Sequence, residues 1–148
     1  MNEEIFFNLI RQGKTQEVYI ALTKYPFLLK SKDSRGSTPI IFASYNNQLE
    51  IVKYLLEKGS DINEKDSSKS TSLMGVSFKG FFPIVKFLVK KKAEIDSQNI
   101  MGSTALIYSA MFNHKEIYNF LIDNGADKFI KDDKGNTAID YARNNDLI

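Results

Sequence analysis

Apolar residues recur at helical spacing in short runs along the whole chain, and most runs end at glycine or asparagine. In segment 33–65, a first helix is expected from Thr38 to about Tyr45, with the threonine as its cap. A second helix is expected from about Leu49 to Lys58, and Gly59 closes it. The apolar residues of this second helix share one face: Ile51, Val52, Leu55 and Leu56. The pattern therefore predicts a helix, a turn and an antiparallel helix.

The same unit is repeated along the chain with a fixed period of 33 residues. Its capping threonine has counterparts at the same spacing, giving the series Thr38, Thr71, Thr104 and Thr137. Five positions before each threonine stands a turn-forming residue, giving Asp33, Asp66, Asn99 and Asp132. A fixed period of this size is typical of stacked repeats, in which each unit packs on its neighbours.

Three segments carry a resemblance to a known family. They are D-S-R-G-S-T-P-I at Asp33–Ile40, E-I-V-K-Y-L-L-E-K-G-S-D-I-N at Glu50–Asn63 and I-D-N-G-A-D at Ile122–Asp127. Together with the period, they resemble the ankyrin repeats. The resemblance implies an all-α solenoid of helix-turn-helix units joined by β-hairpin-like loops, with about 4.5 repeats in one domain, 1–148. The expected units are 1–32 as an N-terminal cap, 33–65, 66–98, 99–131, and 132–148 as a partial C-terminal cap.

Two units depart from this standard. In the first unit, helical spacing is expected to place Ile5, Phe6, Leu9 and Ile10 together. In the unit 66–98, Lys69 and Lys92 stand where glycine is expected, and Gly75 lies inside the first helix. A non-glycine residue in a left-handed turn and a glycine within a helix each cost on the order of 1 kcal/mol. We therefore predict that 66–98 is the least stable unit.

The composition argues against most enzyme classes. The chain has no cysteine and a single histidine, His114, so thiolate nucleophiles and the usual Ser-His-Asp or multi-histidine metal sites are unavailable. Phosphate-binding glycine loops and nucleophile elbows are absent as well. We therefore predict a protein that is not an enzyme and that binds no cofactor or metal. Lys90, Lys91 and Lys92 form the only compact basic run, which we interpret as a solvated helix end.

The charge and the N-terminal segment bear on location and partners. A net charge of +2 is too small to indicate nucleic acid or a membrane as partner. No stretch approaches the about 20 apolar residues of a membrane span, and Glu3 and Glu4 oppose a secretory signal. We expect a cytoplasmic monomer. Lysine outnumbers arginine 17 to 3, which suggests an AT-rich, bacterial genome.

The family resemblance implies a binding surface on the concave side, formed by the hairpin tips and the exposed side of the first helices. At these positions the chain carries several aromatic and methionine residues, which are enriched at interaction sites. Their alternative role is to fold back on the neighbouring repeat and fill gaps. The predicted partner-binding residues are Arg35, Tyr45, Phe78, Lys79, Ile100, Met101, Met111, Phe112 and Lys134.

The predicted function is a non-enzymatic scaffold that binds another protein in this groove. Three contexts resemble bacterial uses of such repeats: an adaptor or chaperone for an enzyme, an immunity protein that neutralises a toxin, and an effector delivered into a host. The alternative function is haem or small-ligand handling for a neighbouring enzyme, because His114 and seven tyrosines accompany the apolar side chains. For His114 itself, the competing interpretation is a structural role in the loop between two helices.

Overall fold

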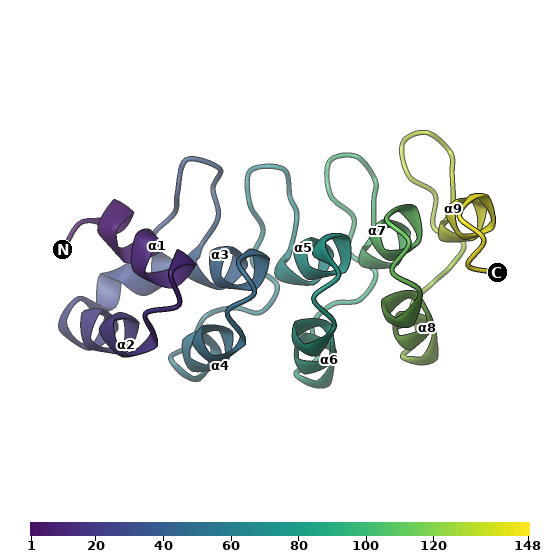
Figure 1. The fold of residues 1–148 in the computed structure, drawn as a ribbon. Coiled ribbons are helices and arrows are strands. Elements are labelled where there is room, and N and C mark those ends of the chain that lie inside the picture. The colour runs from purple at the N-terminus through teal and green to yellow at the C-terminus, as the bar shows by residue number, and fades with distance from the viewer.

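The computed structural model describes residues 1–148 and contains α-helices and one short 3-10 helix, without strands. The predicted all-α class is confirmed (Figure 1). The elements in chain order are α1 (Glu3–Arg11), α2 (Thr15–Lys24), η1 (Pro26–Lys30), α3 (Pro39–Tyr45), α4 (Leu49–Glu57), α5 (Ser72–Lys79), α6 (Phe82–Lys90), α7 (Ala105–Met111), α8 (Lys115–Asp123) and α9 (Ala138–Asn144).

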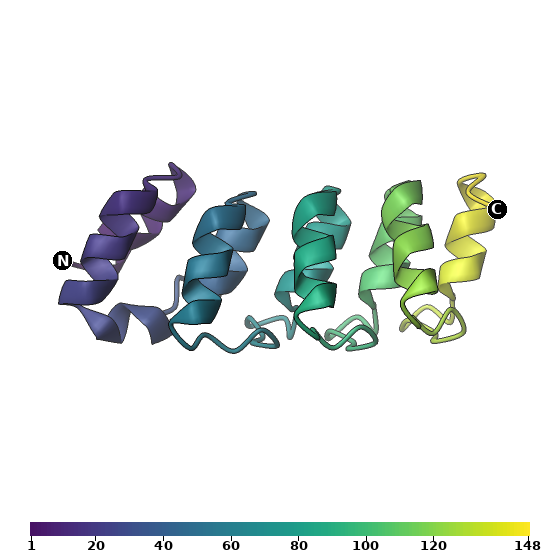
Figure 2. The ribbon, with the colours of Figure 1, turned by 90° about the horizontal axis from the view of Figure 1, so that it is seen from below.

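The helices form two layers that run along the molecule. The first helices of the units, α1, α3, α5, α7 and α9, lie in one row, and α2, α4, α6 and α8 lie beneath them (Figure 1). Seen from below, the pairs stand side by side in chain order, with the loops along one edge (Figure 2). The chain is therefore a solenoid of four helix pairs and a single final helix. None of these helices is both long and apolar enough to cross a membrane.

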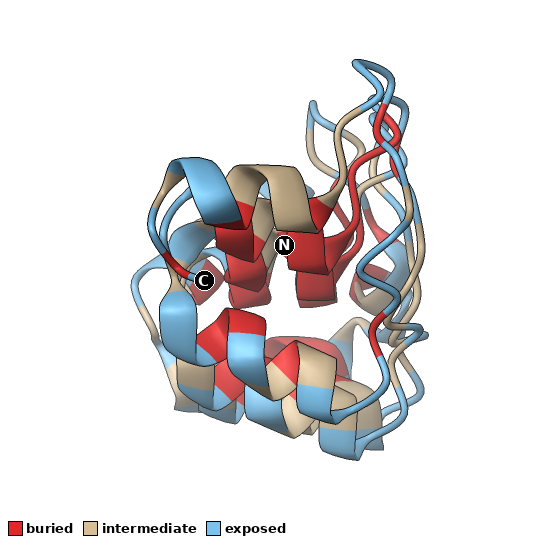
Figure 3. Cartoon of the chain, turned by 90° about the vertical axis from the view of Figure 1, so that its right-hand side faces the viewer, coloured by how far each residue is buried: buried red, intermediate tan, exposed pale blue.

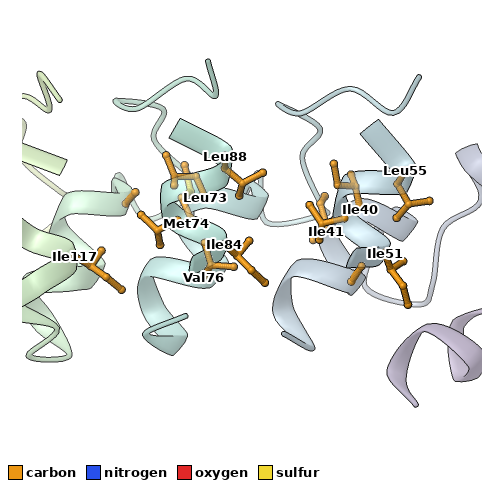
Figure 4. Close-up of a cluster of buried hydrophobic side chains, with 14 of the residues drawn as sticks. Ile40, Ile41, Ile51, Leu55, Leu73, Met74, Val76, Ile84, Leu88 and Ile117 are labelled. Carbon is orange, nitrogen blue, oxygen red and sulfur yellow. The ribbon is translucent and has the colours of Figure 1, made fainter. Parts of the chain in front are cut away.

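The core lies between the two layers, where buried residues line the facing sides of the helices (Figure 3). Aliphatic side chains from successive units follow one another along it, including Ile40, Ile51, Leu73 and Ile84 (Figure 4). Because each pair of helices is too small to bury its apolar face alone, stacking is what completes the core.

The first unit packs differently from the prediction. Phe6 and Ile10 are fully buried, but Ile5 is 49% exposed and the unpredicted Phe7 is buried in its place. Phe7 packs edge-to-face on Phe42 of the next unit, with ring centroids 5.0 Å apart. Ile5 belongs to a terminal unit, which has a neighbour on one side only, and this explains its exposure.

The turns between and after the helices adopt the expected left-handed backbone. Asn47 has a φ of 59° between the helices of its unit, as the sequence predicts. Lys69 and Lys92 have φ values of 60° and 70°, although lysine has no special tolerance for this conformation. The structure therefore confirms that both lysines of unit 66–98 adopt the left-handed backbone expected for glycine.

The capping threonines are equivalent in sequence but not in structure. The side chains of Thr71, Thr104 and Thr137 each accept a hydrogen bond from the backbone three residues on. Thr38 precedes α3 as predicted, but its buried Oγ1 has no hydrogen-bond partner, so the expected side-chain cap is wrong. Thr38 alone of the four is followed by proline.

Candidate interaction groove

The conformation of each hairpin loop is fixed by the side chain of the first residue of its turn. The Oδ1 atom of Asp66 accepts hydrogen bonds from the backbone of Ser68 and Ser70, both at 2.9 Å. Across the same turn, the backbone N–H of Asp66 donates to the carbonyl oxygen of Ser70 at 3.0 Å. Asp33, Asn99 and Asp132 accept the same pair of side-chain contacts. The loops are thus hairpin-like, as predicted, although too short to form strands.

Neighbouring loops are joined near their tips by single backbone hydrogen bonds. The N–H of Ser67 donates to the carbonyl oxygen of Arg35 at 3.1 Å, and that of Ile100 to Ser68 at 3.0 Å. The N–H of Asp133 continues the series to Met101 at 3.0 Å. The loops therefore form one continuous wall that stands beside the first-helix row (Figure 1).

A groove of about 1170 Å³ lies between this wall and the first helices of the N-terminal half. We call it the concave groove; it extends from α1 to Tyr108 on α7. Five of the predicted binding residues line it, namely Arg35, Tyr45, Phe78, Ile100 and Met101. The other four, which lie outside it, are Lys79, Met111, Phe112 and Lys134.

The predicted aromatic residues at the groove pack on one another, and with Tyr108 they form an aromatic ladder of Tyr45, Phe78, Tyr108 and Phe112. The rings of Tyr45 and Phe78 are nearly parallel, with centroids 6.3 Å apart. Phe78 also meets Phe112 at 4.5 Å and Tyr108 at 5.9 Å, both edge-to-face. Such pairs are worth about 0.5–1.5 kcal/mol beyond the area they bury. The ladder therefore joins three repeats, as the gap-filling role predicts, and forms part of the groove floor. Its role in binding a partner stays a prediction.

Two predicted residues are less available than expected. Met111 is half-buried and packs against the core. Lys79 is exposed, but its Nζ lies 4.9 Å from the centre of the Tyr45 ring, in cation–π geometry. Both residues therefore have a role within the fold.

The most exposed apolar residues at the groove are on one loop tip. Ile100 and Met101 are 57% and 56% exposed. In the preceding loop, Ser67 and Ser68 occupy the equivalent positions. The loop of 99–103 is therefore the apolar end of an otherwise polar wall.

The N-terminal end of the groove was not predicted from the sequence. Arg11, Phe7 and Phe42 line it, and the guanidinium carbon of Arg11 lies 5.2 Å from the centre of the Phe42 ring. The signal for Phe42 lies in the repeat register, which aligns it with Gly75, Tyr108 and Tyr141. The charged residues of the groove are mixed in sign: Glu3, Glu4, Asp33 and Asp66 against Arg11, Lys32 and Arg35.

Two tyrosines at this register position hydrogen-bond to the residue that opens their own turn. The Nδ2 atom of Asn99 donates to the hydroxyl oxygen of Tyr108 at 2.8 Å. In the last unit, the hydroxyl group of Tyr141 donates to the Oδ2 atom of Asp132. Burial raises the pKa of Asp132, but hydrogen bonds from Tyr141, Asn136 and Lys134 outweigh it and hold the pKa below its ordinary value.

His114 has a structural contact between repeats. Its Nε2 lies 2.9 Å from the carbonyl oxygen of Phe78, and since a carbonyl only accepts, Nε2 carries the proton. The ring packs against Gly80, where an added Cβ would lie 2.6 Å from Cε1. This geometry supports the structural interpretation of His114. No group of three or more His, Cys, Asp or Glu side chains is placed to hold a metal ion.

Comparisons with known proteins agree with this architecture. A family model described as ankyrin repeats (3 copies) matches residues 71–147, and one described as ankyrin repeats (many copies) matches 10–74. The chain belongs to the ankyrin-repeat family. Ankyrin repeats are generally protein–protein interaction modules and are typically non-enzymatic.

A relative of this ankyrin-repeat chain comes from a virus. The chain is 37% identical over 67 residues to an ankyrin repeat protein of fowlpox virus (strain NVSL). The match covers 43% of this chain and 11% of the viral protein. The chain thus spans about a tenth of the length of the curated relative that it matches. Its bacterial origin stays a prediction from composition.

Proposed function

We propose that this ankyrin-repeat chain is a non-enzymatic scaffold that binds a partner protein in the concave groove. The observation that carries the proposal is the groove itself, which has an aromatic floor at Tyr45 and Phe78 and an exposed apolar rim at Ile100 and Met101. Exposed apolar residues that gather at a hollow are a mark of an interaction site.

Within the proposal, we expect these residues to play different parts. Ile100 and Met101 are free to give apolar contact to a partner, while the half-buried Phe78 supports the floor. Arg35 is exposed at the polar part of the wall, where it could fix the position of an acidic group. Lys134 lies on the last loop, outside the groove, so we expect it to contribute less than Arg35.

The test compares two substitutions of the same kind on opposite sides of the molecule. Ile100→Asp combined with Met101→Asp places charge on the groove rim without disturbing buried packing. Ile20→Asp places one such charge on α2, in the second-helix layer, where Ile20 is 65% exposed. Proteins captured from the native cell by the unchanged chain are identified by mass spectrometry, and the affinity of each purified candidate is measured by calorimetry.

We expect a groove partner to bind the Ile20→Asp variant as well as the unchanged chain. Its affinity for the Ile100→Asp, Met101→Asp variant should fall at least tenfold, because two rim residues then place charge in an apolar contact. Both variants should keep their helical circular dichroism. A partner that loses affinity only with Ile20→Asp would move the site to the second-helix layer and overturn the proposal.

The geometry gives no support to haem handling. The Nε2 atom of the single histidine is held by the carbonyl oxygen of Phe78, and its ring is wedged against Gly80. A haem iron would need that nitrogen without its proton and free of this contact. A Soret band that forms on adding haemin and is lost in His114→Ala would establish the alternative.

A further inference from the structure

Gly75 leaves a hollow at one position of the repeat register. In the three other units that share the register, the position is filled by an aromatic ring, namely Phe42, Tyr108 and Tyr141. Gly75 lies in the middle of α5, has no left-handed backbone, and is therefore not required there by the turn geometry. An added Cβ would have one neighbour within 4 Å, the Cδ2 atom of Tyr45 at 3.4 Å. The space above Gly75 belongs to the concave groove.

In unit 99–131, the ring of Tyr108 occupies the position that Gly75 leaves empty. The ring of Tyr108 packs edge-to-face on Phe78 of the preceding unit, with planes at 88°. In the register, Phe78 corresponds to Tyr45 and Tyr108 corresponds to Gly75. A phenol ring above Gly75 would thus meet Tyr45 in the way that Tyr108 meets Phe78.

The polar end of the hollow offers a hydrogen-bond acceptor, the carboxylate of Asp66. In the last unit, the Oδ1 atom of Asp132 accepts from the turn backbone and Oδ2 accepts from the hydroxyl group of Tyr141. Asp66 has the same turn contacts through Oδ1, and its Oδ2 has no hydrogen-bond donor within the chain. Unit 66–98 therefore combines a half-buried aspartate, one carboxylate oxygen of which has no donor, with an empty ring position.

We propose that this hollow is a receptor for a tyrosine side chain of the partner protein, whose ring lies over Gly75 and whose hydroxyl group donates to Oδ2 of Asp66. The proposal rests on the groove being the binding surface. Tyrosine matches both features because its ring fills the aromatic position and its hydroxyl group supplies the donor that a carboxylate requires. Phenylalanine would leave Asp66 desolvated without a donor, which a polar site discriminates against.

Unit 33–65 does not offer a second site of this kind. Asp33 has the same turn contacts as Asp66, and the residue nine positions later, Phe42, also has no hydroxyl group. Its ring, however, fills the space and packs on Phe7 and beneath Arg11. Only the unit with Gly75 has room for a ring from outside the chain.

The test uses two probes that differ by one hydroxyl group, N-acetyl-tyrosinamide and N-acetyl-phenylalaninamide. Each is titrated into the whole ¹⁵N-labelled chain, and the amide signals of Gly75 and Ser68 are followed. The tyrosine probe is expected to shift both signals in a saturable way, with an affinity at least tenfold higher than that of the phenylalanine probe. Binding by neither probe, or equal binding by both, would overturn the proposal.

The variant Gly75→Tyr provides the second arm. It should close the hollow with the chain's own phenol, abolish the shifts caused by the tyrosine probe, and raise the thermal midpoint of unfolding. Unchanged probe binding by Gly75→Tyr would place the probe elsewhere and overturn the proposal. Because the Ile100→Asp, Met101→Asp variant tests the groove without involving Gly75, loss of the tyrosine receptor and loss of the groove function give separate results.

Discussion

The hydroxyl group of Tyr141 donates a hydrogen bond to the carboxylate of Asp132, the residue that opens the last turn nine positions earlier. At the equivalent positions of the preceding unit, the hydroxyl oxygen of Tyr108 accepts a hydrogen bond from the neutral side chain of Asn99. The two contacts join the same register positions, but Tyr141 donates to a carboxylate, whereas Tyr108 accepts from the neutral amide of Asn99. The uncharged contact therefore serves as a control for the charged one.

We predict that Tyr141→Phe lowers the free energy of unfolding at pH 7 by about 1.5–3 kcal/mol, the usual contribution of a hydrogen bond to a charged group. The pKa of Asp132 is lowered in the folded chain, so this stabilisation is present above about pH 4 and is lost as the pH falls through the folded pKa. The hydrogen bond to Asp132, with burial, raises the pKa of Tyr141, so its stabilisation fades as the pH rises past about 10.

Urea unfolding at pH 7 and pH 3, followed by circular dichroism, checks this prediction. The stability gap between Tyr141→Phe and the unchanged chain should shrink at pH 3. Tyr108→Phe should cost about 1 kcal/mol at both pH values, because Asn99 does not titrate. A gap for Tyr141→Phe that stays constant between the two pH values would contradict the role given to the charge of Asp132.

Two glycines are expected to respond to alanine in opposite ways. Gly75→Ala should stabilise the chain by about 0.5–1 kcal/mol, because Gly75 is inside a helix and the new Cβ would meet only Tyr45 at an ordinary distance. Gly36→Ala should destabilise it by about 1 kcal/mol or more, since Gly36 has a φ of 75° and the new Cβ would lie 2.9 Å from the backbone nitrogen of Ser67. Thermal unfolding of both variants measures the difference, and a lower midpoint for Gly75→Ala would contradict the first expectation.

A similar comparison applies to the capping threonines. Thr104→Val should cost about 1 kcal/mol, because the hydroxyl oxygen that accepts from the backbone N–H of Ile107 is lost. Thr38→Val should be neutral or stabilising, because the buried Oγ1 of Thr38 has no partner to lose. Chemical unfolding of the two variants under one set of conditions is the measurement. Equal losses would show that Thr38 has a partner in solution.

His114→Ala should lower stability by about 1 kcal/mol or more, because the carbonyl oxygen of Phe78 loses its donor and the space beside Gly80 is emptied. Lys115→Ala, the exposed neighbour, should change stability by no more than about 0.5 kcal/mol. Thermal unfolding compares the two. A His114→Ala variant as stable as Lys115→Ala would show that the contact contributes nothing.

Hydrogen exchange tests the prediction that unit 66–98 is the least stable. The strained Lys69 and Lys92 and the helical Gly75 all lie in this unit, so its central amides should exchange faster than those of 33–65 or 99–131. Replacing Lys69 and Lys92 with glycine should slow that exchange and raise stability by about 1 kcal/mol for each position. Central amides in 66–98 that exchange more slowly than in both neighbouring units would refute the prediction.

The fold was predictable because its determinants are local and repeated. The spacing of Thr38 and its counterparts marks where first helices begin, and the left-handed turns at Asn47 and Lys69 follow from the same register. The first unit has no such register, which is why the exposure of Ile5 and the burial of Phe7 escaped prediction.

The site was less predictable, since contacts between repeats decide it. The register places Phe78 on the outer side of α5, but only the structure shows it packed among Tyr45, Tyr108 and Phe112. Likewise, the sequence marks Gly75 as unusual within a helix, while the opposing Asp66 becomes meaningful once both are seen in one groove. Side-chain neighbours 33 residues apart are set by stacking, and a single sequence does not show how closely the units approach.

The single backbone hydrogen bonds between neighbouring loops have a mechanical consequence. At each joint, the helices share a continuous apolar core, whereas the loops are linked by one backbone hydrogen bond, such as that donated by Ser67, and by few side-chain contacts, such as that of Asn99 with Ser70. Bending of the solenoid should therefore concentrate at the loop edge, where each joint has little to resist it. Small rotations shared among the three joints would change the width of the concave groove. The groove could then bind partner segments of somewhat different width.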